Sequence, residues 1–144
     1  MIKRAVSIAL KIPDNTAYTA LVALRRLGVA VHRLERSEIR FFDDNGDAPS
    51  LVRRIEADET MFNPNKHRLS LLDETIPRLG EVWIEPLEAR GAQSVPDAIS
   101  WRLFDAEGTP VGRAVLDAAI ERLLCNAAID RAVTRDRDNR FGSE

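Results

Sequence analysis

The stretch IRFFDDNG at residues 39–46 recurs in similar form as WRLFDAEG at residues 101–108. Each copy is followed by an apolar-periodic stretch that ends at an asparagine, in TMFNP at residues 60–64 and in LLCNA at residues 123–127. The two turns lie 62 residues apart and the two asparagines 63, so one inserted residue accounts for the difference. A repeat of this period indicates two similar supersecondary units in one small protein. The alternative is chance similarity, because Phe-Asp-x-x-Gly is a common strand-to-turn sequence.

The composition is that of one globular domain. The chain has 144 residues, of which 44% are apolar and 31% charged, and this length is sufficient to bury a core. A net charge of −2 gives no bulk attraction to nucleic acid or to a membrane, and we expect neither as a partner. A single cysteine excludes an internal disulfide. The start of the chain lacks the apolar core of a signal peptide, and no apolar run is long enough to span a membrane; we therefore expect a cytoplasmic protein.

The first half predicts strands and helices in alternation. The expected elements are a strand over residues 5–12, a helix over 14–28, a strand over 29–41 and a helix over 49–62. Apolar residues alternate in the first strand, and Pro13 ends it. Asp14, Asn15 or Thr16 can cap the first helix, and Gly28 stands where a C-cap glycine is expected. Polar residues at 35–37 predict a bulge, bend or tight hairpin within the second strand.

The second half is less regular. It predicts a strand at 69–71, a strand over 98–104 and a helix over 111–125. Residues 79–90 are ambiguous: their apolar residues have helical spacing, but Pro86 disfavours a helix interior, and Val82 and Ile84 would share one face of an edge strand. The repeat favours the helix, which is our prediction. The polar residues 134–144 predict a mobile tail.

These elements predict an α+β two-layer sandwich of ferredoxin-like character, with the strands in one sheet and the helices on one face. Two β-α-β-α units are expected in tandem, over residues 1–65 and 66–133, within one compact domain.

One family resemblance follows from the asparagine motifs. ERLLCNAAID at residues 121–130 resembles the helix-ending LLxNPxIE motif of the PurS-type small subunit of phosphoribosylformylglycinamidine synthase, an enzyme of purine biosynthesis. MFNP at residues 61–64 is similar to the same motif, and the order strand, helix, long bent strand, helix also matches. Ala127 replaces the proline of the motif, Ser37 stands where the family usually has glycine, and the Asp-x-x-Gly segment before the first helix is missing.

The resemblance implies a non-catalytic structural subunit without a cofactor. PurS-like subunits form dimers or tetramers and bridge the glutaminase and synthetase subunits, so a homo-oligomer and these two partners are the expectation. The resemblance also implies that the ends of the helices serve packing or a subunit interface, formed by Met61, Phe62, Asn63, Leu123, Leu124 and Asn126.

Few residues indicate chemistry of their own. His32 and His67 have no partner at helical spacing and make a poor metal site. Cys125 ends an apolar stripe, which favours a buried small side chain over a nucleophile. The acidic turn at 43–47 fails as a calcium loop, because Phe41 would occupy the first ligand position. We therefore expect no catalytic or metal site. The alternative function is a ferredoxin-like small-molecule sensor or regulatory domain, with a ligand held between the two halves.

Overall fold

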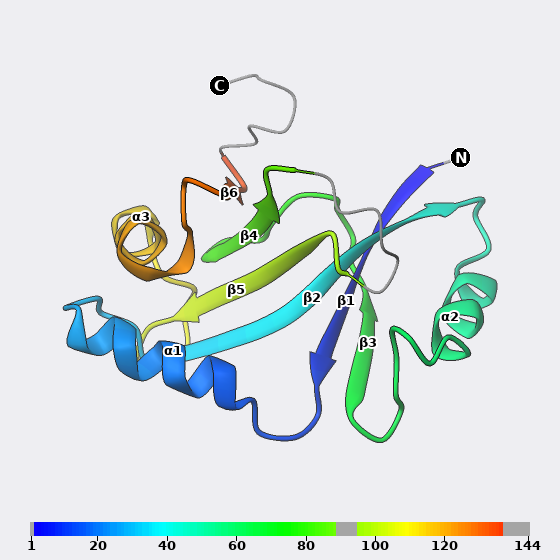
Figure 1. Cartoon of the computed structure of the whole chain (residues 1–144), viewed down its shortest axis with the longest axis horizontal. Coiled ribbons are helices and arrows are strands. Elements are labelled where there is room, and N and C mark those ends of the chain that lie inside the picture. The colour runs from blue at the N-terminus through cyan, green and yellow to red at the C-terminus, as the bar shows by residue number, and fades with distance from the viewer. Residues whose placement is uncertain (1, 89–94, 137–144) are drawn as a thin grey trace.

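The computed structural model describes residues 2–88 and 95–136, which form one six-stranded sheet with helices packed against it (Figure 1). The strand order is β3-β1-β2-β5-β4-β6, and neighbouring strands are antiparallel throughout. The α+β class is confirmed. In chain order the elements are β1 (Ile2–Leu10), α1 (Asn15–Arg26), β2 (Arg33–Asp44), α2 (Ala48–Glu56), β3 (His67–Leu71), β4 (Glu81–Pro86), β5 (Ala98–Phe104), α3 (Arg113–Ala119), the π-helix η1 (Ile120–Leu124) and β6 (Asp130–Thr134).

The helices cover one face of the sheet in two groups (Figure 1). Val6 and Ile8 of β1 pack against α2, and Val82 and Ile84 of β4 belong to the cluster formed with α1 and α3. Because side chains alternate between the faces of a strand, the strand pairing places these four side chains on the same face. The predicted two-layer arrangement is therefore observed.

The opposite face carries a smaller apolar cluster. Its buried members are Ala5, Ile39, Trp83, Ala98 and Val133. The connection between β3 and β4, residues 72–80, must pass three strands, since β1, β2 and β5 separate these two in the sheet. Leu72 packs against the cluster and donates its N–H to the Ala5 carbonyl at 2.9 Å. This crossover therefore lies on the face opposite the helices.

The first helix begins and ends as predicted. The Asp14 carboxylate accepts from the N–H of Ala17 at 3.1 Å, an N-cap bond. Gly28 follows with a φ of 84°, and the next N–H, of Val29, donates to the Leu24 carbonyl. These bonds satisfy backbone groups that a helix end leaves open.

The predicted break in the second strand is wrong. β2 pairs without interruption, through residues 38–44 with β1 and through residues 33–39 with β5. Leu34 packs on the helix side, whereas Ile39 packs in the cluster on the opposite side. Each face of this strand is covered along only part of its length. Its buried apolar side chains therefore point to the helix side at one end and to the opposite side further along. The polar residues between mark that change of face and no interruption of the strand pairing.

The prediction of a helix over residues 79–90 is also wrong. Residues 81–86 form β4, which lies between β5 and β6 and so is not the edge strand of the alternative. Val82 and Trp83 have no exposed surface, and Ile84 has 8%, because both faces of the strand are covered. Pro86 is tolerated as the last residue of the strand. Residues 89 and 90 lie outside the described part of the chain.

The last strand was missed by sequence reasoning. β6 spans Asp130–Thr134, so the predicted tail begins within a strand, and residues 137–144 lie outside the described part of the chain. β6 occupies the position that β3 occupies 63 residues earlier. The two asparagines are separated by the same 63 residues, so the repeat itself could have predicted this strand.

Candidate functional site

The two asparagines that end the repeated motif adopt the same turn. Asn63 Oδ1 accepts from the N–H two residues later at 2.9 Å, and Asn126 Oδ1 does the same at 3.1 Å. In both turns the asparagine carbonyl accepts from the N–H groups three and four residues later, at 2.9 and 2.8 Å. These are Asx turns, in which the side chain replaces a backbone acceptor. The asparagine has a local structural role in both halves.

Each turn leads into an edge strand of the sheet, β3 after Asn63 and β6 after Asn126. The two edges are five strand spacings apart, about 24 Å. The structure therefore does not bring the predicted interface residues of the two halves together. Each half presents its own turn, at opposite edges of one sheet.

The apolar residues before the asparagines are mostly packed inside. Phe62 is 6% exposed and belongs to the cluster under α2, and Met61 packs against the same cluster. Leu124 packs against the cluster formed by α1 and α3. Leu123 is 40% exposed and remains accessible to a partner.

An exposed apolar patch lies beside the second turn. Leu87 and Ile129, here called the apolar edge patch, are 49% and 55% exposed, and the Leu87 N–H donates to the Ile129 carbonyl at 2.9 Å. In the first half the matching bond runs from Lys11 to Lys66, at 2.7 Å. The two halves thus present lysines at one edge and aliphatic side chains at the other.

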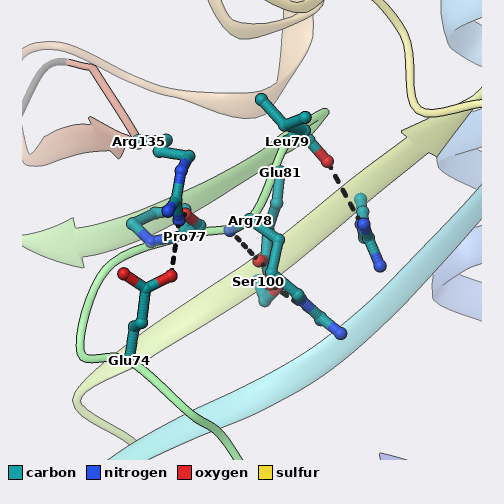
Figure 2. A network of polar contacts seen from close by, with 8 residues as sticks. Glu74, Pro77, Arg78, Leu79, Glu81, Ser100 and Arg135 are labelled. Atoms are coloured by element: carbon teal, nitrogen blue, oxygen red, sulfur yellow. Dashed lines mark hydrogen bonds and ion pairs between the residues drawn. The ribbon is translucent and has the colours of Figure 1, made fainter.

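A buried carboxylate lies on the face opposite the helices, and its contacts are shown in Figure 2. Glu81 has no exposed surface. Its Oε1 accepts from the Arg78 N–H at 2.7 Å and from Arg78 Nε at 3.0 Å, and its Oε2 accepts from Arg78 Nη2 at 3.2 Å and from Ser100 Oγ. Burial alone would raise the pKa of Glu81, but the hydrogen bonds from Arg78 and Ser100 outweigh burial and hold the pKa below its ordinary value.

Further bonds from the same crossover reach neighbouring strands. Arg102 of β5 donates to the Leu79 carbonyl at 3.2 Å, and Arg135, just after β6, donates to Glu74 at 2.8 Å and to the Pro77 carbonyl at 3.2 Å (Figure 2). Together with Glu81, these contacts hold the crossover against the sheet. Sequence reasoning missed the network. Its one signal was a pair of glutamates within the apolar run EVWIE at residues 81–85.

A cavity of about 500 Å³ opens between α2 and β3. It is lined by Lys11, Val52, Glu56, Phe62, Pro64, His67, Arg68, Leu69 and Leu71. His67 Nδ1 accepts from the Asn63 N–H at 2.9 Å, so the asparagine turn fixes the imidazole that lines this cavity. The volume is within the range of sites for small molecules.

The other residues considered for chemistry lie apart from this cavity. His32 is exposed, and Cys125 is partly buried. Burial, and to a lesser degree Asp130, raises the pKa of the Cys125 thiol, which disfavours the reactive thiolate. Within residues 2–88 and 95–136, no group of three or more metal-ligating side chains has a geometry that could hold a metal ion.

Comparison with family models, with curated proteins and with solved structures found no significant match to this chain. In the described part of the chain, no helix combines the length and the apolar character needed to cross a membrane.

Proposed function

We propose that this chain is a non-catalytic structural subunit in which two PurS-like units of ferredoxin-like character are fused in tandem. In this proposal it forms a homo-oligomeric scaffold and associates with the glutaminase and synthetase subunits of phosphoribosylformylglycinamidine synthase. The observation that carries the proposal is the repeated asparagine turn, which precedes an edge strand in each half with the same hydrogen bonds.

The strand order supports the tandem arrangement. β3-β1-β2 in the first half corresponds to β6-β4-β5 in the second, and β2 pairs with β5 at the centre of the sheet. Ser37 pairs with Ser100 near the middle of that contact. The second half has no described helix between its first two strands, where the first half has α1. The second half has one inserted residue between its glycine turn and its asparagine, in the stretch that contains η1. The hydrogen bonds of a π-helix span five residues and those of an α-helix span four, so a π-helical turn accommodates one extra residue.

The apolar edge patch provides the contact surface of the scaffold. Leu87 and Ile129 are exposed side by side, and Leu123 on the preceding η1 is also exposed. Burial of such aliphatic side chains against a partner is favourable at roughly 25 cal/mol per Å² of apolar surface. The predicted interface residues Leu123 and Asn126 belong to this end of the sheet, whereas Met61 and Phe62 stabilise the first half internally.

The test is the mass of the protein in solution, measured by light scattering after size-exclusion chromatography, together with native pull-down of the two synthase subunits. The double variant Leu87→Lys with Ile129→Lys copies the lysines of the first half and should dissociate the oligomer and release the partners. Tyr18→Lys is the control, because Tyr18 is 68% exposed on α1, away from the patch. A monomeric wild-type protein that captures neither subunit would contradict the proposal.

A second candidate function is a small-molecule sensor or regulatory domain. The cavity between α2 and β3 favours it, since its volume suits a small ligand. The cavity belongs to the first half, so the ligand would bind there and not between the halves. A ligand that binds only the folded chain should raise its melting temperature.

A further inference from the structure

The cavity between α2 and β3 has a polar rim and an apolar floor. Lys11 and Glu56 at the rim are exposed, whereas Phe62 is 6% exposed. Leu69 and Leu71 of β3 line the cavity and are half-buried. A ligand there would meet two cations, Lys11 and Arg68, and one anion, Glu56, near solvent, with hydrocarbon below them.

The hydrogen bonds at the rim leave donors for a ligand. Lys11 Nζ donates to the Pro64 carbonyl at 2.8 Å, and an ammonium has three donors. His67 Nδ1 is the acceptor of the Asn63 N–H, so the neutral imidazole carries its proton on Nε2 and can donate there. Lys11 and His67 can therefore bind a carboxylate, and Glu56 can bind an ammonium group.

We infer that this cavity binds a small α-amino acid with an apolar side chain. The ligand carboxylate lies against Lys11 and His67, its ammonium group against Glu56, and its side chain on Phe62 and Leu69. A neutral apolar compound would leave the charged rim unused, and a polar anion would leave the apolar floor unused. This inference rests on the sensor as the second candidate function and is independent of the scaffold proposal.

Calorimetry and thermal melting of the full chain with defined compounds test the inference. L-leucine and L-phenylalanine should bind and raise the melting temperature. Three compounds should bind at least about tenfold more weakly, because each lacks one feature: 4-methylpentanoate lacks the ammonium group, 3-methylbutylamine lacks the carboxylate, and glycine lacks the apolar side chain. Adenosine monophosphate is the comparison ligand of another class.

Two variants locate the site. Lys11→Met and Glu56→Gln should each weaken leucine binding about tenfold or more, because each removes a hydrogen bond to a charged group. Glu56→Gln should not weaken the binding of 4-methylpentanoate, which has no ammonium group to lose. Arg26→Gln on the exposed surface of α1 is the matched control and should bind leucine as the wild type does.

The outcomes separate the inference from the sensor function. Leucine binding that is unchanged in both variants would place the site elsewhere and overturn the inference. A melting shift with adenosine monophosphate and none with the amino acids would also overturn it, while the sensor function would stand. No shift with any compound would count against both.

Discussion

Replacement of Arg78 by methionine should destabilise the protein strongly, because it leaves the Glu81 carboxylate buried without its cation. The side chain of Arg78 provides two of the hydrogen bonds to Glu81, at 3.0 and 3.2 Å. Breaking a buried ion pair from one side costs about 3–5 kcal/mol. The Arg78 side chain is 44% exposed, so the pair is in part screened by water. We therefore expect the lower end, about 3 kcal/mol at pH 7.

Glu81→Gln should cost less, about 1–2 kcal/mol, because the arginine it leaves behind can reach water and the amide can keep part of the bonding.

The pH dependence of stability adds a second readout. In the wild type the pKa of Glu81 is lowered on folding, so the carboxylate contributes stability above its ordinary value of 4.5 and loses that contribution as the pH falls through the folded value. In Arg78→Met, fewer hydrogen bonds oppose the effect of burial, so the pKa of Glu81 rises. The difference in the free energy of unfolding between Arg78→Met and the wild type should therefore shrink as the pH falls and Glu81 becomes protonated.

The assay is urea unfolding followed by tryptophan fluorescence, since Trp83 is fully buried in the adjacent cluster and reports on the packing. Lys3→Met is the control, because the ion pair of Lys3 with Asp43 is 65% and 63% exposed and such pairs contribute less than about 1 kcal/mol. A loss in Arg78→Met no larger than in this control, or a loss that is the same at pH 7 and pH 4, would refute the reasoning.

Three further predictions concern single positions. Gly80→Ala should lower the free energy of unfolding by about 3 kcal/mol, because Gly80 has a φ of 73° and a Cβ there would lie 2.8 Å from a proline Cβ. Gly46→Ala, at a φ of 95° in open space, should lower it by about 1 kcal/mol. Equal losses of stability in urea unfolding would contradict the steric argument. Asn63→Ala and Asn126→Ala should each cost about 1 kcal/mol and speed amide exchange in the edge strand that follows, whereas unchanged exchange would show that the turns do not hold these strands. Cys125 should react with iodoacetamide at pH 7 more slowly than a free thiol, because burial raises its pKa, and should react at the ordinary rate in urea; fast labelling of the folded protein would contradict this.

Local sequence signals predicted the elements whose stability is local. The cap at Asp14, the glycine at 28 and the apolar spacing between them specify α1 without reference to the rest of the chain. α2 begins close to its predicted start, where the N-cap Asp47 accepts from the Ser50 N–H, but it ends at Glu56 and not at residue 62 as predicted. The mistaken helix over residues 79–90 has the opposite cause. The apolar residues of this segment fit both the helical and the strand periodicity. Only the position between β5 and β6, where both faces are buried, selects the strand.

The cavity and the Glu81 network could not be predicted from the sequence. Their residues come from separate elements, and none forms a motif with its chain neighbours. Glu81 and Ser100 meet because β4 pairs with β5. Lys11 and Glu56 line one cavity because β1, β3 and α2 pack together.

By itself the sequence determined an α+β composition and helices with one apolar face, because periodicity and capping act over a few residues. The tertiary structure alone decided that β2 pairs with β5, that the asparagine turns stand at opposite edges of one sheet, and that a buried carboxylate of β4 binds the crossover. These features depend on contacts between distant residues, whose energies come from burial and pairing and leave no local pattern in the chain.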